Sequence, residues 1–437
     1  MPRDALLVHC IVIAAALACV LPFLLNRRLF APDRTGFWVW IAFLICLVVN
    51  PALTLASRDF SVYDYYTRGT DLTSARVFWI LFTAAAGILV FFLAYLNTRP
   101  AGIVVSHIRL SPIPVLIIVA VSMAIGWNAI LRYRIAGNSD LRVVGGKFVG
   151  SVSGWQSETH GFIIFPCLLL IALKGYRLMG LLAAAFYIAL RLGDKGDRFS
   201  ILALPLAVLL FYMIRRGRRW PPLLYSALAM VLLLVLVARG HGSLASLQHS
   251  GNDIQRIAGR ALSNIGRGAD TAMLPTLYRE SDLVERNGFT YGVTCVQEIF
   301  LAPLPRTHFP WKDDVLSFIP GVKYRNESWL GDVYHAKSTV IGSFYGYGGI
   351  LGVIIGMACL GWLLRKMDGL LQRTQPLLVN LWAVMVLSTV WLGILGSIEW
   401  WYKVIMMWSL PLFALVLLAK LSAALAPARL EPQRRIA

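Results

Sequence analysis

The chain alternates long apolar runs with short polar or basic links, and this alternation constrains its fold more than any other feature. Runs of about 15 to 23 residues match the length that an α-helix needs to cross a bilayer. Hydrophobic residues make up 58% of the 437 residues and charged residues only 14%, whereas soluble domains have about 25% charged residues. The sequence therefore predicts an all-α polytopic membrane protein. Its first run, 5–25, lacks the basic leader and cleavage site of a signal peptide.

The apolar runs predict about eleven transmembrane helices, within a range of about 10 to 12. The predicted spans are 5–25, 36–55, 75–96, 113–131, 158–173, 178–191, 199–214, 222–238, 339–364, 377–396 and 402–420. The fifth and sixth are short, and Pro166 interrupts the fifth. This pair could therefore form a re-entrant hairpin instead of two full spans, and the orientation of the other helices is the same in both cases.

The basic residues of the links predict how the helices are oriented. One set of links holds 18 of the 41 Lys and Arg residues, the opposite set holds 12, and the large loop holds 11. Because links rich in Lys and Arg stay in the cytoplasm, the first set is expected there, with the N-terminus and the large loop on the other side. Three regions follow: 1–238 with eight helices and short loops, the loop 239–338 with amphipathic helices, and 339–437 with three helices and a basic cytoplasmic tail.

The net charge of +19 does not by itself indicate a nucleic-acid-binding protein. Basic residues at membrane boundaries contact lipid phosphates, and no nucleic-acid-binding module is recognisable in the chain. Five of the six cysteines fall in apolar runs, and only Cys295 lies in the large loop. No Cys and His residues have zinc-like spacing. We therefore expect membrane lipids as partners, and no nucleic acid, metal or cofactor.

Arginines also gather in the links on the non-cytoplasmic side, where topology does not require them. The group comprises Arg132, Arg134, Arg142, Arg191 and Arg198. They could contact lipid phosphates or pair with the aspartates of the same links. Alternatively, they could line a cavity for a phosphorylated ligand, because the guanidinium group stays charged and its fork of donors matches phosphate oxygens.

The large loop is predicted to be structured. Apolar residues recur at helical spacing over 254–265, a second short helix is expected from Ser281 to Gly288, and an apolar stretch covers 291–301. Prolines then punctuate an irregular segment that carries several basic side chains. These are Arg306, His308, Lys312, Lys323 and Arg325.

His335 lies at the end of the loop, shortly before a glycine-rich span. A histidine has a pKa of about 6.5, which allows proton transfer near neutral pH, so His335 is a candidate base at the mouth of a membrane cavity. Asp332 could orient it if the segment is helical. The alternative is an interfacial histidine that is hydrogen-bonded to water. The glycines that open the next span, at 342, 346, 348, 349 and 352, allow a backbone or a ligand to approach closely.

Several short motifs in and around the loop resemble one known family. They are Gly-Phe-Thr-Tyr-Gly at 288–292, Pro-Leu-Pro-Arg at 303–306, Pro-Trp-Lys at 310–312, Gly-Asp-Val-Tyr at 331–334 and Gly-Tyr-Gly-Gly at 346–349, with Gly-Asp-Arg at 196–198 opening a span. They look like the outer loop of bacterial oligosaccharide repeat-unit polymerases, the Wzy-type O-antigen polymerases. The resemblance covers 190–355 and the layout of the spans. Family members often carry an acidic residue near the position of His335, and a histidine there looks more like the related O-antigen ligases.

The resemblance implies a GT-C-like membrane glycosyltransferase in the bacterial inner membrane, with the large loop in the periplasm. Such an enzyme polymerises oligosaccharide repeat units carried on undecaprenyl pyrophosphate, for O-antigen (lipopolysaccharide) or exopolysaccharide synthesis, by inverting and metal-independent transfer. Arg198 and Arg306 would stabilise the pyrophosphate leaving group, and His335 would take the proton of the acceptor hydroxyl. The substrate-binding residues expected behind them are Arg325, Arg134, Lys312, Asp332 and Arg132. A chain-length regulator protein could be a partner.

Three other functions stay open on the sequence. An O-antigen ligase, or another lipid-linked glycosyltransferase, would differ from the polymerase only in its acceptor. A flippase or transporter of lipid-linked sugars would break no bond, and it would usually show internal repeats, of which none is convincing here. A non-catalytic assembly factor of envelope synthesis would use the large loop to bind a partner protein.

Overall fold

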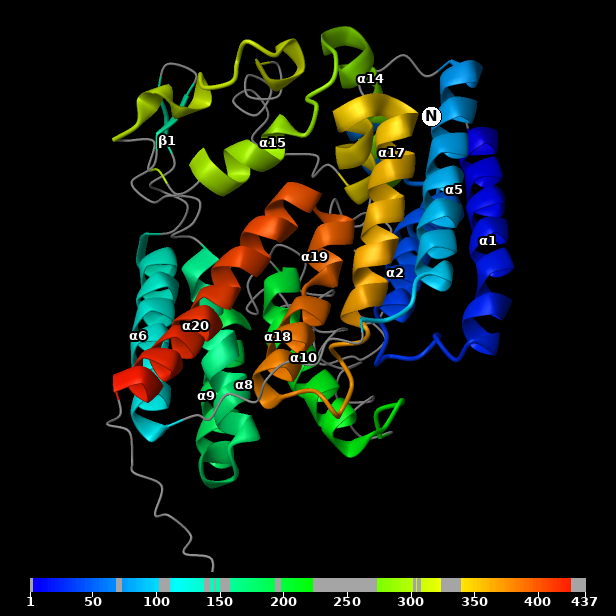
Figure 1. Ribbon diagram of the computed structural model, residues 1–437. Helices are drawn as coiled ribbons and strands as arrows, with labels where there is room; N and C mark the ends of the chain where they lie inside the picture. The colour runs from blue at the N-terminus through cyan, green and yellow to red at the C-terminus, as the bar shows by residue number, and fades with distance from the viewer. Residues whose placement is uncertain are drawn as a thin grey trace, which may run out of the picture.

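The computed structural model describes most of the chain. The described residues are 3–67, 73–101, 111–136, 142–144, 147–149, 158–192, 198–222, 273–301, 304, 308–323 and 339–425. They form a helical bundle in which most long helices run in the same general direction (Figure 1). At one end of this bundle lie α14, α15 and β1, which cover the ends of the long helices.

The α-helices follow the apolar runs of the sequence. They are α1 (Arg3–Asn26), α2 (Thr35–Leu44), α3 (Asn50–Ser57), α4 (Ser61–Tyr66), α5 (Ser74–Asn97), α6 (Pro112–Ala136), α8 (Ile164–Ala172), α9 (Arg177–Leu192), α10 (Arg198–Arg216), α14 (Met273–Asn287), α15 (Val293–Val296), α17 (Val340–Met367), α18 (Leu377–Ser388), α19 (Val390–Leu395) and α20 (Ile398–Leu425).

Short turns and one small hairpin connect or extend these helices. They are the π-helical turns η1 (Ile45–Val49) and η5 (Gln297–Leu301), the 3₁₀ turns η3 (Thr159–Ile163), η4 (Lys174–Tyr176) and η6 (Pro310–Asp313), and the strands β1 (Arg142–Val144) and β2 (Lys147–Val149). The strands pair antiparallel, with Val143 opposite Phe148.

Among the described residues, six helices are long and apolar enough to cross a membrane. They are Asp4–Asn26, Thr35–Ser57, Ser74–Asn97, Pro112–Leu131, Val340–Met367 and Ile398–Ser422. Each coincides with a predicted span, so the prediction of a multi-pass membrane protein is confirmed. The second consists of α2, η1 and α3 end to end, because the π-turn continues the helical path.

The predicted fifth and sixth spans form a sharply bent pair. Thr159–Ala172 and Lys174–Arg191 meet at 113°, and they add a seventh span if the pair is counted as one. After the bend α8 and α9 pack closely, since a Cβ at Gly180 would lie 2.7 Å from the backbone nitrogen of Ile171. A broken span or a re-entrant loop has this shape, which is the alternative that the short runs left open.

The remaining predicted spans give shorter helices or lie outside the described residues. α10 follows the run 199–214, and α18 and α19 divide the run 377–396 between them. The run 222–238 and the helix expected over 254–265 lie outside the described residues. The count of about eleven spans and the GT-C-like relationship therefore stay predictions.

The helix α14 is longer than the sequence predicted. It ends at Asn287, directly before Gly288 as expected, but it begins at Met273 and not at Ser281. Pro275 lies in its first turn, where a missing backbone N–H has no helical acceptor to lose, so the proline does not break the helix. Ser281 and Asp282 are buried inside the helix and do not cap it.

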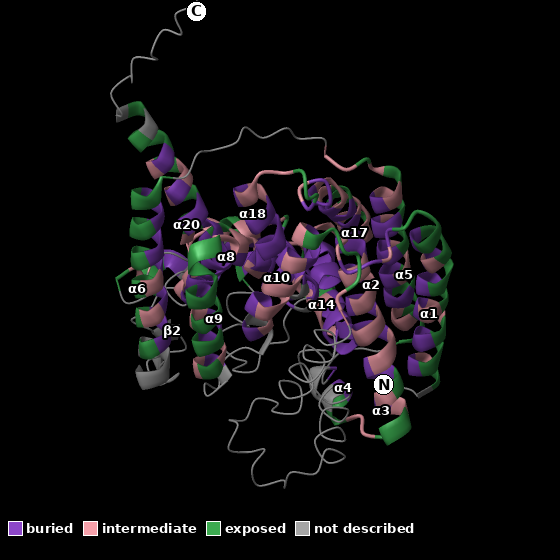
Figure 2. Ribbon diagram, turned by 90° about the horizontal axis from the view of Figure 1, so that it is seen from below, coloured by how far each residue is buried: buried purple, intermediate pink, exposed green. Residues whose placement is uncertain are grey.

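Glycines allow the central helices to approach closely. A Cβ at Gly87 of α5 would lie 2.8 Å from the Val353 side chain of α17, and one at Gly361 of α17 would lie 2.3 Å from the carbonyl oxygen of Phe91. Small residues at such contacts are typical of membrane helix pairs. Buried positions face the interior, while exposed positions lie on the outward faces of helices such as α1, α6 and α9 (Figure 2). Leu182 and other large apolar side chains occupy these outward positions, as expected where helices face lipid.

The helix α17 is broken near its start. Gly348 (φ −170°, ψ 34°) and Gly349 (φ 63°, ψ −145°) are not helical, so a short first segment precedes the long one. The two segments touch: a Cβ at Gly352 would lie 2.2 Å from the carbonyl oxygen of Phe344, and one at Gly356 would lie 2.4 Å from the Phe344 ring. The close approach that the sequence predicted for this glycine-rich start is thereby confirmed.

Candidate functional site

Two of the sequence motifs meet at the broken start of α17. The backbone N–H of Thr290 donates to the carbonyl oxygen of Gly346 at 2.8 Å, and the Thr290 hydroxyl donates to the same oxygen at 3.2 Å. The ring of Phe289 lies 3.4 Å from where a Cβ of Gly349 would be. The segment 288–292 thus packs directly on 346–349, and we call this contact the motif junction.

A third motif-bearing segment reaches the same place. A Cβ at Gly321 would lie 2.6 Å from the carbonyl oxygen of Gly288 and 2.7 Å from that of Phe289, so only a glycine fits between these backbones. Gly321 follows η6, which contains the Pro-Trp-Lys motif. A hydrogen bond of 3.2 Å from Gln297 Nε2 to the Val315 carbonyl oxygen also ties η5 to this segment. Three loop segments that are separate in sequence therefore converge on one end of α17.

A buried carboxylate, Glu399, lies behind the motif junction. Its two oxygens accept hydrogen bonds from the hydroxyls of Thr294 at 2.9 Å and Ser343 at 3.0 Å. These three residues belong to α20, α15 and α17, and Glu399 is only 4% exposed. A buried charge is costly unless hydrogen bonds compensate it, and here the donors come from both sides of the junction.

The broken start of α17 adds a tyrosine and a cysteine to this group. The hydroxyl of Tyr347 lies 3.0 Å from the Sγ of Cys295, and it also interacts with the carboxylate of Glu399. Tyr347 and Cys295 are half-buried, whereas Glu399 is buried. Hydroxyl, thiol and carboxylate groups therefore form a connected polar path from the interior of the bundle toward its surface.

The junction also contains a strained turn. Tyr291 (φ 49°) and Gly292 (φ 74°) both have left-handed backbone conformations. Glycine adopts this conformation freely, but a bulky residue does so at a cost of roughly 1 to 2 kcal/mol. The side chain of Tyr291 is 70% exposed, and its ring meets the edge of Phe289 at 6.0 Å.

Further ionisable side chains are buried at the same end of the bundle. They are Glu158, His160, Arg191 and Lys403. The indole Nε1 of Trp400, next to Glu399, donates to Glu158 Oε1 at 3.0 Å, and Tyr187 lies within electrostatic range of both Arg191 and Glu158. Lys403 follows Glu399 by one helical turn. Buried ionisable side chains in a membrane protein are costly and are a usual mark of a functional site.

Four of the predicted site residues belong to described elements. Lys312 is buried, and its Nζ donates to the carbonyl oxygen of Leu304 at 2.9 Å, so it holds the proline-rich segment together. Arg132 and Arg134 lie in the last turns of α6, and Arg198 is the first residue of α10. The structure describes the backbone of these three arginines, and their proposed contacts with pyrophosphate stay predictions.

The other predicted site residues lie outside the described residues. They are His335, Arg306, Arg325 and Asp332. His335 precedes Thr339 by four residues, and Thr339 caps α17 by accepting a hydrogen bond of 3.0 Å from the Gly342 N–H. The assignment of His335 as the base is therefore neither supported nor contradicted.

Sequence reasoning missed Glu399, Glu158 and Lys403. Glu399 falls between the predicted spans 377–396 and 402–420, where it looked like an ordinary link residue. Its partners Thr294 and Ser343 are 105 and 56 residues away, so no local pattern reveals them. The available signal was the presence of acidic and basic residues next to tryptophans at the start of an apolar run.

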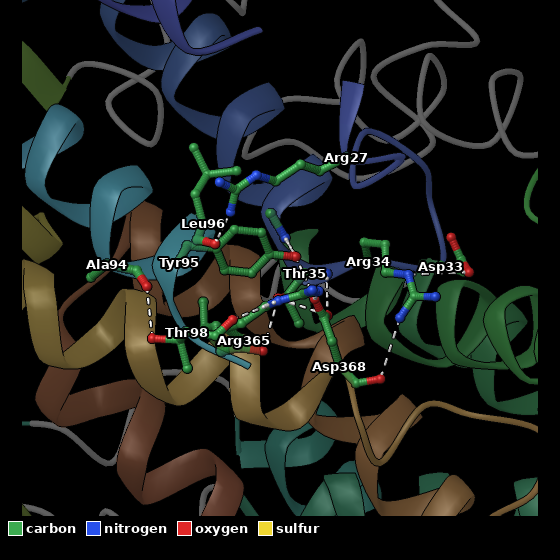
Figure 3. Close-up of polar contacts among 12 residues, drawn as sticks. Arg27, Asp33, Arg34, Thr35, Ala94, Tyr95, Leu96, Thr98, Arg365 and Asp368 are labelled. Carbon is green, nitrogen blue, oxygen red and sulfur yellow. Dashed lines mark hydrogen bonds and ion pairs between the residues drawn. The ribbon is translucent and has the colours of Figure 1, made fainter. Parts of the chain in front are cut away.

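A second polar cluster lies at the opposite end of α17 (Figure 3). Asp368 is fully buried, and its Oδ1 accepts hydrogen bonds from the Thr35 N–H at 2.9 Å and the Thr35 hydroxyl at 3.0 Å. Its Oδ2 accepts from the Tyr95 hydroxyl and from Arg365 at 3.0 Å. We call these four residues the Asp368 cluster. It joins the N-terminus of α2 to the C-terminal ends of α5 and α17, and it is a structural lock because its donors all serve the fold.

Asp33 lies beside this cluster in the loop between α1 and α2. Burial raises the pKa of its carboxyl group, which is only partly offset by the neighbouring Arg34, and its Oδ1 accepts no hydrogen bond. The Arg34 Nε lies 3.5 Å from the other carboxylate oxygen. The charged form of Asp33 is therefore less well stabilised than that of Asp368.

Among the residues that the structure describes, no group of three or more His, Cys, Asp or Glu side chains is placed to hold a metal ion. No protein-family model, curated protein or solved structure matches the chain. A function therefore has to come from the chemistry of its own residues.

Proposed function

We propose that this protein is a membrane glycosyltransferase that polymerises oligosaccharide repeat units carried on undecaprenyl pyrophosphate. The observation that carries the proposal is the motif junction, where the segments 288–292 and 346–349 meet over the buried carboxylate of Glu399. These motifs resemble those of the bacterial repeat-unit polymerases. The bacterial inner membrane, with the large loop in the periplasm, is the location that goes with this reaction.

In the proposed reaction an acceptor sugar hydroxyl attacks the anomeric carbon of the donor glycan. The new glycosidic bond forms as the bond from that carbon to the pyrophosphate oxygen breaks, and undecaprenyl pyrophosphate leaves. His335 takes the proton of the attacking hydroxyl. A single displacement inverts the anomeric configuration.

Positive charge near the pyrophosphate would stabilise the leaving group in the transition state. Arg198 and Arg306 are proposed for this role, with Arg325, Arg134 and Arg132 around the same ligand. Arg198 begins α10 and the other two described arginines end α6, so the chain brings arginines to helix ends from separate spans. The bent pair of α8 and α9 offers irregular backbone within the membrane, beside which a lipid tail could lie.

Glu399 acts in this scheme as a positioning residue. By accepting from Thr294 on one side and Ser343 on the other, it holds the loop segment against the break in α17. Displacement of a positioning group by about 1 Å can cost about 100-fold in rate, so the junction has to be rigid if it orients a glycan.

The second candidate function is glycan transfer to a different acceptor. His335 resembles the histidine of the O-antigen ligases, which use the same class of donor and transfer the glycan to lipid A core. A flippase of lipid-linked sugars is the non-catalytic alternative. The polar groups described above gather at one end of the bundle and not at its middle, which favours chemistry at a membrane surface over carriage across the membrane.

The test is a polymerisation assay with protein purified in detergent and an undecaprenyl-pyrophosphate-linked repeat unit from the host. We expect a ladder of products on a gel that survives EDTA and is lost in Arg198→Ala, Arg306→Ala and His335→Ala. Arg218→Ala, on the opposite side of the membrane, is the matched control and should leave the ladder intact.

Three results would redirect the proposal. A ladder that persists in all three variants would keep the function and reject the site. Transfer that appears only when lipid A core is supplied would identify a ligase. No transfer under either condition, with well-folded protein, would reject the glycosyltransferase.

A further inference from the structure

The strained turn of the motif junction has no structural role that requires a tyrosine. Tyr291 has a φ of 49° and is followed by Gly292, whose φ is 74°. A glycine or an asparagine at 291 would adopt this conformation more easily than an aromatic residue does. Strain of this kind persists where the surrounding structure enforces it, and it is found most often at ligand-binding and catalytic sites.

The structure enforces this turn from both sides. Thr290 is held by its two hydrogen bonds to the carbonyl oxygen of Gly346. After the turn, the Val293 N–H donates to the carbonyl oxygen of Thr290 at 3.0 Å, and the Cys295 N–H donates to that of Gly292 at 3.0 Å. The backbone around Tyr291 is therefore fixed, while its side chain stays 70% exposed.

The fixed backbone presents the ring of Tyr291 outward. Its only ring contact among the described residues is an edge-to-face one with Phe289, at 6.0 Å and 71°. Phe289 in turn rests on Gly349 at the break of α17. The ring is thus supported from behind by the motif junction, and at least one of its faces is free to stack.

From this geometry we infer that Tyr291 is a glycan-stacking residue, which binds the apolar C–H face of a pyranose ring next to the reacting sugar. An aromatic ring offers a large rigid surface at a low entropic cost, and the phenol hydroxyl can in addition hydrogen-bond a sugar hydroxyl. This inference rests on the proposed function, since it names a binding residue for the same substrate class.

A membrane anchor is the competing use of an exposed tyrosine, because tyrosines gather at the interface of bilayers. An anchor needs only a mobile amphipathic side chain and gains nothing from a left-handed backbone. The strain and the pinned turn therefore favour a ligand with a defined position.

The experiment compares Tyr291→Gly with Leu316→Gly. Leu316 is the other non-glycine residue of this loop with a left-handed backbone (φ 70°), so both substitutions relieve the same kind of strain. Only the first removes the exposed ring. Tyr291→Phe keeps the ring and loses the hydroxyl.

We expect all three variants to unfold within about 2 °C of the wild type in detergent. In the ladder assay, Tyr291→Gly should raise the KM for the lipid-linked repeat unit about 3- to 10-fold, with kcat changed less than about twofold. Leu316→Gly and Tyr291→Phe should keep the wild-type KM. An unchanged KM in folded Tyr291→Gly would overturn the inference, as would a defect seen in lipid nanodiscs and absent in detergent micelles, which would indicate an anchor.

A second readout does not depend on turnover. Saturation-transfer NMR with the free repeat-unit oligosaccharide should show transfer from wild-type protein and a loss of at least about half of it in Tyr291→Gly. If the wild type makes no ladder but this transfer is present and sensitive to Tyr291, the proposed polymerase reaction fails and the glycan-binding inference stands. If the transfer is equal in both proteins, the inference fails whatever the ladder shows.

Discussion

The two ends of α17 each hold a buried carboxylate, but the two are used differently. Asp368 accepts hydrogen bonds from Thr35, Tyr95 and Arg365, and these bonds join three helices that have regular geometry where they meet. Glu399 accepts from two hydroxyls beside a broken helix and a strained turn. One end is therefore built with a charged donor and no strain, and the other with neutral donors and strained backbone.

This difference separates stability from function within one helix. A carboxylate paired with arginine and a helix N-terminus is a strong anchor, because its charge is compensated from several directions. Strained backbone, exposed aromatic surface and buried ionisable groups are costly to folding, and they are retained where a ligand or a reaction needs them. The comparison predicts that substitutions at the Asp368 cluster lower stability and that those at the motif junction lower activity.

The largest effect is expected for Asp368→Ala. The substitution leaves Arg365, Thr35 and Tyr95 without their acceptor in a buried site, and removal of one partner from a buried ion pair costs about 3 to 5 kcal/mol. Thermal unfolding in detergent should show a large drop in the midpoint or no monodisperse protein at all. A midpoint within about 3 °C of the wild type would remove the basis for calling this cluster a structural lock.

Glu399→Gln tests the other half of the comparison. The glutamine keeps the size of the side chain, but its amide nitrogen cannot accept from a hydroxyl, so one of the two bonds to Thr294 and Ser343 is reversed or lost. We expect the polymerisation rate to fall at least about tenfold while the unfolding midpoint changes by less than about 3 °C.

Asp368→Asn is the matched control for Glu399→Gln, because it makes the same chemical change at the opposite end. Its unfolding midpoint should fall while the rate per folded molecule stays near wild type. If both variants lost activity and stability to the same extent, the division of roles between the two ends would be wrong.

Gly349→Ala should have an intermediate effect. The φ of 63° and ψ of −145° at Gly349 belong to a region that is nearly restricted to glycine, and a Cβ would also press on the Phe289 ring at 3.4 Å. The expected cost is about 1 to 3 kcal/mol, together with loss of ladder formation. Gly175→Ala is the control, since that glycine has open space around it and no left-handed backbone. Circular dichroism melts and the ladder assay on both proteins check this prediction.

The smallest effect is expected for Asp33→Asn. Burial raises the pKa of Asp33, so the folded state disfavours its charge, and the penalty grows as the pH rises through the folded pKa. The variant should match the wild type in acid and become more stable by about 1 to 2 °C as the pH rises to neutral. Unfolding midpoints measured at a series of pH values test the sign. A variant that is less stable at neutral pH would show that the Arg34 contact outweighs the burial.

The membrane helices could be predicted from sequence because each apolar run contains its own signal. A run such as 75–96 has to become a helix in lipid, where no other structure satisfies its backbone within the segment. The break in α17 was signalled only as a place of close approach, since glycines reveal permitted backbone conformations and not the ones adopted. The start of α14 was misplaced because Pro275 hides a helix whose first turn tolerates it.

The candidate site was less predictable because its residues meet only in three dimensions. The motif pattern pointed to 288–292 and 346–349, and the structure places these two segments in contact. It did not point to Glu399, which is 105 residues from Thr294 and has no motif around it. The proposed roles of His335, Arg306 and Arg325 stay predictions, as these residues lie outside the described part of the chain.

The most direct test of the central claim is to locate the substrate on the protein. An undecaprenyl-pyrophosphate-linked repeat unit that carries a photoreactive diazirine on its sugar would be bound, irradiated and mapped by mass spectrometry. We predict crosslinks in peptides that cover 288–301 and 340–350, which are competed by unlabelled substrate. Competed crosslinks confined to the Asp368 end, around Thr35 and Arg365, would contradict the assignment of the motif junction as the functional end.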